Sequence, residues 1–278
     1  MEAVFAQRER IRNPVGAGLF YPDDKNEILK SIRSFGLEAG KGGFAKAIIA
    51  PHGAWDFSGA LAANAFSAAM GRSANIKRVV ILGPIHDKRE RGLFLTNSHF
   101  FHTPLGKIRV DQEITGELEF IGNYFEIDDI PHLGEHSIEI LLPFIKYCFP
   151  RASIVPVIMG QPKKKYIKDL AQALKTVIKP VLNDTLIVVS CNLSCDYDTA
   201  TAQRLAEETI RLFSQKDAAA LGSAILDGSI NSCGGGLVMS LLESGLLDIE
   251  CSCSAADYMV SAVGLENKTV FYSSMAFG

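Results

Sequence analysis

The stretch KRVVILG, residues 77–83, decides the fold class. It is a short, continuously apolar run rich in β-branched residues, which is the pattern of a strand buried on both faces of a sheet. Three other runs have the same character: FAKAIIA at 44–50, ASIVPVIMG at 152–160 and DTLIVVS at 184–190. We therefore predict four strands in the interior of one sheet.

Amphipathic stretches flank these runs, as in SGALAANAFSAAMG, EHSIEILLPFIKYCF, KKYIKDLAQALKTVI and TAQRLAEETIRLFSQ. This alternation predicts an α/β fold with a largely parallel central sheet and helices on both of its faces. Towards the end of the chain, ECSCSAADYMVSAV and KTVFYSSMAF indicate two adjoining strands around GLENK, an antiparallel hairpin at the edge of the sheet. No repeat or long linker divides the chain, so residues 1–278 are predicted to form a single domain.

The composition narrows the classes of function that are possible. Hydrophobic residues make up 47% and charged residues 21%, as in an ordinary globular protein. The net charge of −3 gives no basic excess for nucleic acid, and QPKKKY is interpreted as a solvated helix start. The N-terminus lacks a signal-peptide h-region and no stretch of 18 apolar residues occurs, so we expect no membrane segment. Six scattered cysteines indicate reduced thiols, and we expect a cytoplasmic protein.

Histidines follow two of the predicted strands. In open α/β sheets, ligands bind at the carboxyl ends of the strands. His52 comes after AIIAP and His86 after VVILGPI, so each follows a strand and a proline. Imidazole is a common metal ligand, but a histidine satisfied by backbone groups in a turn is the alternative. Asp87 is either a carboxylate that orients His86 or a solvated turn residue.

The segment LGEHSIEILLPF is predicted to begin a helix with Glu135, His136 and Glu139. Residues 135 and 139 would share one helix face, with His136 about 100° away, so the three do not form a helical metal triad. The helix dipole favours carboxylates at this position, and H-E-x-x-H is absent. Whether His136 lines the crevice stays open.

Cys233 precedes three glycines and an apolar helix in SINSCGGGLVMSLLES. A helix N-terminus stabilises a thiolate, which makes this cysteine a candidate soft metal ligand or nucleophile, and a buried structural cysteine is the alternative. The fourth strand ends in IVVSCNLSCDYD, residues 187–198. This segment can be interpreted as a metal site, as a nucleophile or as the polar end of a buried strand.

Seven segments occur in the order RNPVGAGLFYP, IIAPHGAWDFSGALAANAF, VVILGPIHD, FHTPLGKIRVD, GEHSIEILLPF, IVPVIMG and NSCGG. From about residue 10 onward the chain thus resembles the Memo family, also called AmmeMemoRadiSam system protein B. The resemblance implies a single Memo-like domain similar in fold to the β subunit of class III extradiol ring-cleavage dioxygenases, hence a three-layer α/β/α sandwich. It also implies a metal-binding triad of His52, His86 and Cys233.

The chain departs from the family at 190–196. The family usually has S-S-D-L-S-H-Y there, and its histidine occupies the acid/base position of the related dioxygenases. This chain has Asn192 at the aspartate position and Cys195 at the histidine position. General acid/base catalysis would then fall to His136 or Cys195. We expect the cavity to be lined by Asn192, Trp55 and Asp87.

Three functions follow from the resemblance. The first is a metal-dependent oxidoreductase related to the extradiol dioxygenases, holding iron, zinc or copper and acting on a small molecule. The second is a non-enzymatic metal- or ligand-binding protein with AMMECR-domain and radical SAM partners, which the family name records as gene neighbours. The third is a degenerate relative without catalysis.

Two narrower expectations concern the ligand set. A thiolate at Cys195 would complete a closed zinc tetrahedron with the triad, unless Cys195 only packs at the strand end. His99 and His102 lie in the turn-rich NSHFFHTPLG and are not expected to be ligands.

Overall fold

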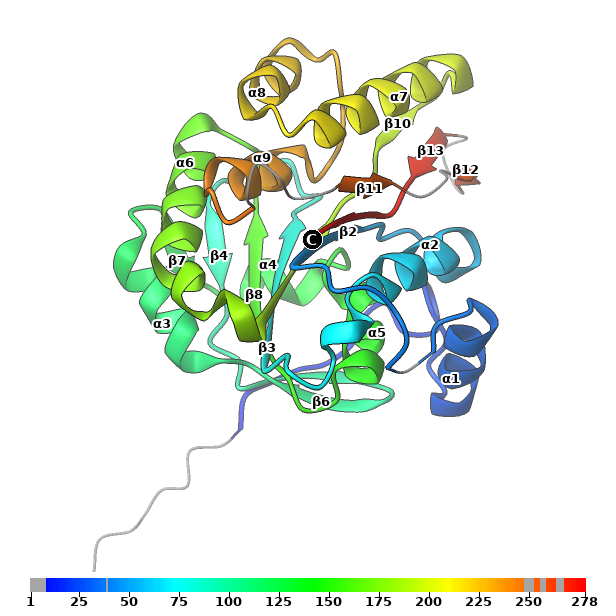
Figure 1. Cartoon of the computed structure of the whole chain (residues 1–278), viewed down its shortest axis with the longest axis vertical. Helices are drawn as coiled ribbons and strands as arrows, with labels where there is room; N and C mark the ends of the chain where they lie inside the picture. Colours follow the sequence, from blue (N-terminus) through cyan, green and yellow to red (C-terminus); the bar gives the residue numbers. More distant parts are fainter. Residues whose placement is uncertain (1–8, 39, 248–252, 256–258, 264–267) are drawn as a thin grey trace, which may run out of the picture.

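The computed structural model describes residues 9–38, 40–247, 253–255, 259–263 and 268–278. Within these ranges the principal element is an eight-stranded sheet with the order β11-β14-β2-β9-β3-β8-β4-β7 (Figure 1). The sheet runs through the middle of the molecule and helices lie on either side of it.

The four predicted strands form the centre of this sheet. They are β2 (Ala47–Ala50), β9 (Thr185–Ser190), β3 (Arg78–Pro84) and β8 (Ser153–Met159), and each pairs in parallel with its neighbour. Because all four point the same way, their carboxyl ends lie at one edge of the sheet, the upper edge in Figure 1. The prediction of a largely parallel central sheet is confirmed.

Both faces of the central strands are buried, as their sequences require. Along β2, Ile48 and Ala50 pack into one hydrophobic cluster, whereas Ala47 and Ile49 pack into another on the opposite face. This alternation follows from the two-residue period of a strand. A strand with two buried faces therefore has no polar position until it ends.

Helices supply the two outer layers. The first cluster contains side chains of α1 (Lys25–Ser34), α2 (Trp55–Ser67) and α5 (Leu142–Cys148). The second contains side chains of α3 (Gln112–Ile121), α6 (Lys164–Ala173), α8 (Ala218–Asp227), α9 (Gly235–Glu243) and the end of α7 (Thr199–Gln215). The three-layer α/β/α arrangement is confirmed.

The helix predicted from residue 135 begins later. A short helix, α4 (Ile130–Gly134), ends before Glu135, whose backbone is extended. A 3₁₀ turn, η2 (Glu139–Leu141), then leads into α5. Glu135 and Glu139 therefore do not share a helix face, because the chain bends between them to bring both carboxylates into contact with other segments.

The C-terminal hairpin is present but serves two sheets. β12 (Met259–Val263) and β13 (Lys268–Tyr272) are antiparallel and form a small sheet with β10 (Ser194–Asp196). β11 (Cys253–Ala255) and β14 (Met275–Phe277) pair in the large sheet, where β14 lies between β11 and β2. The predicted turn at 264–267 lies outside the described residues.

Shorter elements complete the fold. At the other side of the large sheet, β4 (Leu93–Leu95) is antiparallel to β8 and parallel to β7 (Phe125–Ile127). A third sheet contains β1 (Ile11–Arg12), β5 (Phe100–Thr103) and β6 (Gly106–Arg109). No helix in the described part of the chain is long and apolar enough to cross a membrane.

Candidate functional site

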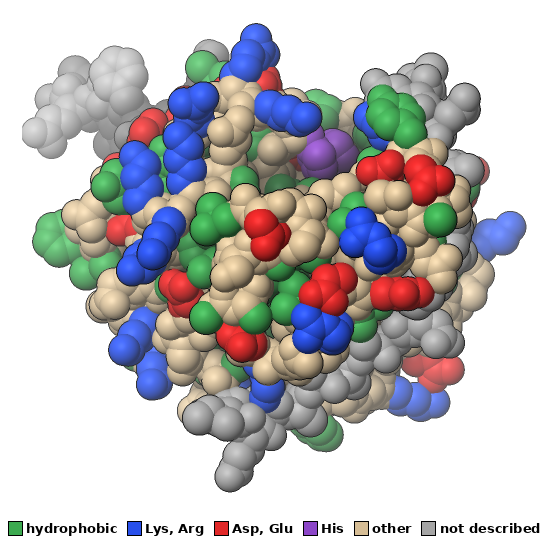
Figure 2. Space-filling model, turned by 90° about the horizontal axis from the view of Figure 1, so that it is seen from above, with side chains coloured by type: hydrophobic (Ala, Val, Ile, Leu, Met, Phe, Trp, Pro, Cys, Tyr) green, Lys and Arg blue, Asp and Glu red, His purple; other side chains and the backbone are tan. Residues whose placement is uncertain are grey.

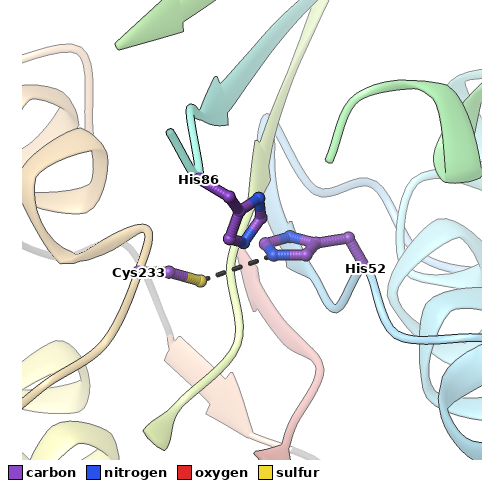
Figure 3. A group of neighbouring side chains, drawn as sticks. All are labelled: His52, His86 and Cys233. Carbon is purple, nitrogen blue, oxygen red and sulfur yellow. Dashed lines mark hydrogen bonds between the residues drawn. The ribbon is translucent and has the colours of Figure 1, made fainter. Parts of the chain in front are cut away.

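The structure brings His52, His86 and Cys233 together at the carboxyl edge of the central strands. His52 follows β2, His86 follows β3 and Cys233 precedes α9. One donor atom of each lies within 4.8 Å of the other two. Figure 3 shows the Cys233 sulfur pointing at the His52 ring, with the His86 ring beside it. The expected convergence of these three residues is confirmed.

His52 is held in one tautomer. Its Nδ1 atom lies 2.7 Å from the Ser190 hydroxyl, which itself donates to the Ser137 carbonyl at 2.6 Å. Ser190 therefore accepts from Nδ1–H, which leaves the lone pair on Nε2. That Nε2 atom lies 3.4 Å from the Cys233 sulfur. Burial lowers the pKa of His52 more than Cys233 raises it, so the ring is neutral at pH 7.

His86 is oriented by a carboxylate. Its Nδ1 atom lies 3.0 Å from Glu135 Oε1, and its backbone N–H donates to Glu135 Oε2 at 2.7 Å. The other ring nitrogen faces Cys233. Burial lowers the pKa of His86, but hydrogen bonds to Cys233 and Glu135 outweigh it and raise the pKa to about 10. The surroundings of this nitrogen therefore stabilise a positive charge.

Glu135 makes several contacts that support this part of the site. Its Oε1 atom also accepts from the backbone N–H groups of His136 and Ser137, both at 2.8 Å. Burial raises the pKa of Glu135, but His86 outweighs burial and brings it down to about 2. A carboxylate behind a histidine fixes its tautomer and makes it a better ligand.

Of the two roles left open for Asp87, the structure supports the solvated turn residue, and Asp87 is not among the residues that line the cavity described below. Its carboxylate binds the Arg89 side chain at 2.6 Å, and the pair lies at the surface. The turn after β3 carries Asp87 away from the imidazole, so its alternative interpretation, a solvated turn residue, is correct. Glu135 was singled out from the sequence for the helix dipole alone; its contact with His86 is long-range and left no sequence signal.

Cys233 is half-buried and contacts several polar groups. Its sulfur accepts from the Asn192 N–H at 3.3 Å and lies 3.8 Å from the Asn192 carbonyl oxygen. The contact with Cys191 and burial raise the pKa of the Cys233 thiol, against the influence of His52 and His86. Asn192 also accepts from the His52 N–H through Oδ1 at 3.0 Å, so one residue positions both ligands.

His136 lies between two rings. It stacks on Phe20 and on His86, with centroids 4.7 Å apart in each case. Burial lowers the pKa of His136, against an opposing effect of Glu135. A neutral, partly exposed imidazole next to the three candidate ligands can accept or donate a proton near pH 7.

These side chains open into a cavity of about 260 Å³. A histidine is visible from outside in Figure 2, which looks onto this edge of the sheet and shows charges of both signs around it. The cavity is lined by Phe20, His52, Gly53, Ala54, Phe57, His86, His136, Asn192, Ser194, Cys195, Asn231, Cys233, Val270 and Tyr272. The space suits a small organic molecule.

The prediction that Trp55 lines this cavity is wrong. Trp55 is buried beneath it, donates from Nε1 to the Ile140 carbonyl at 3.2 Å and packs against Phe144. As the first residue of α2 it points into the hydrophobic layer rather than to the strand ends. Phe20, Asn231 and Tyr272 line the cavity but were not singled out from the sequence, because each comes from a distant segment.

Cys195 lines the same cavity from β10, where it is exposed. Its backbone N–H donates to Asn231 Oδ1 at 3.2 Å, and its carbonyl accepts from Asn231 Nδ2 at 2.7 Å. Among the described residues the group of donors around His52 does not include Cys195, so the closed tetrahedron is not formed. Neither His99 nor His102 belongs to a donor group.

Comparison with known proteins places this arrangement in a family. A family model described as "Memo-like protein" matches residues 12–276. A MEMO1 family protein of Thermotoga neapolitana is 32% identical over 268 residues, covering 92% of this chain and 96% of that protein. One from Methanobrevibacter smithii is 29% identical over 244 residues, covering 84% and 86%.

A solved structure also shows a weak likeness. It is an uncharacterized protein, JW3007, from Escherichia coli K12, with a TM-score of 0.44 and 13% sequence identity over 73% of this chain and 87% of that chain. This likeness is too low to support an inference about fold or function.

Proposed function

The chain belongs to the Memo family, and we propose that His52, His86 and Cys233 bind one divalent transition metal in a metal-dependent oxidoreductase. One observation carries the proposal: two imidazoles with fixed Nδ1 partners and one thiol direct their remaining donor atoms at one point beside a cavity. These donor atoms contact one another, with Cys233 Sγ 3.4 Å from His52 Nε2.

The donor set fits a metal. Two imidazole nitrogens and one thiolate are ligands for zinc and copper and are compatible with iron. Three protein ligands leave a coordination position open, as catalytic sites do and closed structural zinc sites do not. When bound, such a metal supplies Lewis-acid chemistry, and iron or copper also supplies one-electron chemistry.

The remaining residues have separate tasks. Asn192 positions His52 and Cys233, and Glu135 orients His86. His136 moves a proton to or from a molecule in the cavity, because it is the partly exposed imidazole next to the three ligands. Phe20, Phe57 and Tyr272 exclude water around that molecule. The resemblance to extradiol dioxygenases supports an aromatic substrate and a reaction that consumes oxygen.

A second function is favoured by one specific feature. The family's acid/base histidine is replaced by Cys195, which lines the cavity but lies outside the group of candidate ligands. This favours binding without turnover, in a non-enzymatic protein that acts with AMMECR-domain and radical SAM partners, or in a degenerate relative. The cytoplasm is the compartment proposed in either case, because the thiols of Cys148, Cys191 and Cys233 suit a reducing environment.

Metal analysis tests whether the three candidate ligands bind a metal at all. The parent, His52→Ala, Cys233→Ala and the matched control His99→Ala are purified without added metal and measured by elemental analysis. We expect about one metal ion per chain in the parent and the control, and near-complete loss in the other two variants. Equal metal content in all four proteins would refute the site.

Oxygen consumption with a panel of catechols then tests the chemistry. Uptake that requires the bound metal, and that falls by about two to four orders of magnitude in His136→Gln, supports the oxidoreductase with His136 as the proton-transfer group. Retained metal with no oxygen uptake favours the non-enzymatic alternative.

A further inference from the structure

Cys191 is a buried thiol beside the candidate ligands that the proposed function does not use. We propose that Cys191 is the resolving thiol of an oxidative modification site. In this site a hydroperoxide oxidises Cys233, and Cys191 then closes a disulfide that removes Cys233 from the metal. The inference rests on the proposed function only in its last step, because the thiol pair is present whether or not a metal binds.

The two sulfur atoms share their surroundings. Both lie close to the Asn192 carbonyl oxygen, Cys191 Sγ at 3.4 Å and Cys233 Sγ at 3.8 Å. A Cβ atom placed on Gly234, the residue after Cys233, would be 2.7 Å from Cys191 Sγ. The side chain of Cys191 therefore packs directly against the backbone that carries Cys233.

The close approach depends on the glycines after Cys233. Any side chain at 234 would collide with the Cβ and Sγ atoms of Cys191, at 2.5 and 2.7 Å. The strand end and the loop before α9 can meet only because residue 234 lacks a Cβ atom. Disulfide formation needs this kind of proximity, since bonded cysteines have Cα atoms about 4.4–6.8 Å apart.

The two thiols differ in access. Cys233 lines the cavity, whereas Cys191 is 1% exposed and is absent from its lining. A small peroxide entering the cavity thus meets Cys233 first. The Asn192 N–H, which donates to Cys233 Sγ at 3.3 Å, stabilises negative charge on that sulfur during the attack. Cys191 is shielded from solvent oxidants yet lies next to the oxidised atom.

The chemistry balances in two steps. Cys233 sulfur attacks a peroxide oxygen, the O–O bond breaks, and a sulfenic acid and one water (or alcohol) result. Cys191 sulfur then attacks the sulfenic sulfur, the S–O bond breaks, and a second water leaves as the S–S bond forms. Two thiols lose two electrons and two protons, which reduce the peroxide. The metal site is left with two histidines.

The first test uses metal-free protein and hydrogen peroxide, with peptide mapping by mass spectrometry. We expect a peptide pair cross-linked between Cys191 and Cys233, and two fewer titratable thiols per chain. The matched control Cys148→Ser, which removes a buried cysteine from the opposite hydrophobic layer, should give the same cross-link. A cross-link from Cys233 to Cys195, or irreversible oxidation of Cys233 with no cross-link, would overturn the proposal.

The second test uses Cys191→Ser, in which the hydroxyl can keep the contact with Ser232 that Cys191 makes at 2.9 Å. Parent and variant are treated with peroxide and then with dithiothreitol. We expect the parent to recover its Cys233 thiol and the variant to recover less than about a tenth, because an unresolved sulfenic acid proceeds to irreversible products. Equal recovery in both proteins would refute the role of Cys191.

Zinc release, followed with a chromophoric chelator, connects the modification to the metal. We expect peroxide to release zinc from the loaded parent and dithiothreitol to restore its zinc-binding capacity. A protein that forms the Cys191–Cys233 cross-link but never binds zinc refutes the proposed function and leaves the thiol pair intact. A protein that binds zinc but forms no cross-link refutes the role of the thiol pair and leaves the proposed function standing.

Discussion

The two walls of the cavity are built differently. The inner wall, formed by His52, His86 and Cys233, lies at the ends of buried strands and before α9 and is held by contacts from deep in the fold. The outer wall, formed by β10 and Asn231, lies in a small separate sheet: β10 pairs with β13, and Asn231 makes two hydrogen bonds with the exposed Cys195. The residues proposed to bind metal are those that the fold itself positions.

A buried ion pair supports the inner wall. Arg12 pairs with Glu139, and both side chains are almost fully buried. Glu139 also accepts from the N–H groups of Val15 and Gly16 and from the Tyr21 hydroxyl, while Arg12 donates to the Glu135 carbonyl at 2.9 Å. The N-terminal segment is thereby tied to the residue that orients His86. The outer wall is held instead by the pairing of β10 with β13 and by the Ser194 hydroxyl, which donates to the Ala202 carbonyl at 2.6 Å.

The largest expected effect comes from breaking this ion pair. Glu139→Gln leaves the Arg12 charge buried without its carboxylate, which should lower the free energy of unfolding by about 3–5 kcal/mol. Urea denaturation measures the change. Glu208→Gln, which breaks the exposed Arg211–Glu208 pair, is the control and should have no measurable effect. A loss as small as that of the control would show that the inner wall does not depend on the pair.

His132 makes the stability of the folded protein depend on pH. It is buried, and burial lowers its pKa from 6.5 to about 4. Below pH 6.5 the unfolded chain binds this proton and the folded chain does not, so stability present above pH 6.5 is lost as the pH falls towards 4. The loss amounts to about 3 kcal/mol.

The variant His132→Gln should remove this part of the acid sensitivity. Unfolding free energies of parent and variant, measured by denaturation between pH 4 and pH 8, should converge on the acid side. The difference between the two proteins should stay constant from pH 7 to pH 8, where His132 is neutral in both states. Parallel curves throughout would contradict the prediction.

Glu135→Gln sharpens the comparison at the metal. The substitution keeps the shape of the side chain but removes the negative charge behind His86, so metal affinity should fall by about 10–100-fold. Competition with a chelator of known affinity measures it. Asp87→Asn is the matched control, because Asp87 pairs with Arg89 at the surface instead of with His86. Equal losses in the two variants would restore the original role of Asp87.

The smallest effect is expected at the outer wall. Cys195→His introduces the family's histidine, but metal affinity should stay within about threefold of the parent because position 195 is outside the donor group. Alkylation of Cys195 should proceed at the same rate in metal-free and metal-loaded protein. Strong protection of Cys195 by metal would revive the four-ligand site and remove the difference between the two walls.

Sequence reasoning succeeded where the pattern is local. Buried strands alternate strictly between two faces, so their ends could be located from KRVVILG and FAKAIIA, and with them His86 and His52. It failed where partners are distant in the chain. Glu135 is 49 residues from His86 and Ser190 is 138 from His52, and neither spacing has a signature. Trp55 and Asp87 were misplaced because one residue on a helix or turn changes the direction of a side chain.

The position of β14 has a consequence for synthesis of the protein. The strand that positions His52, β2, is covered on one side by β9 and on the other by β14, which is made some 225 residues later. At roughly 5–20 residues per second, translation leaves one edge of β2 uncovered for on the order of ten seconds or more. During that time the nascent chain exposes an apolar strand edge, a structure that pairs with other chains and that chaperones bind. Residues 275–277 close that edge, so the strand that positions His52 is paired on both sides only after they have been made.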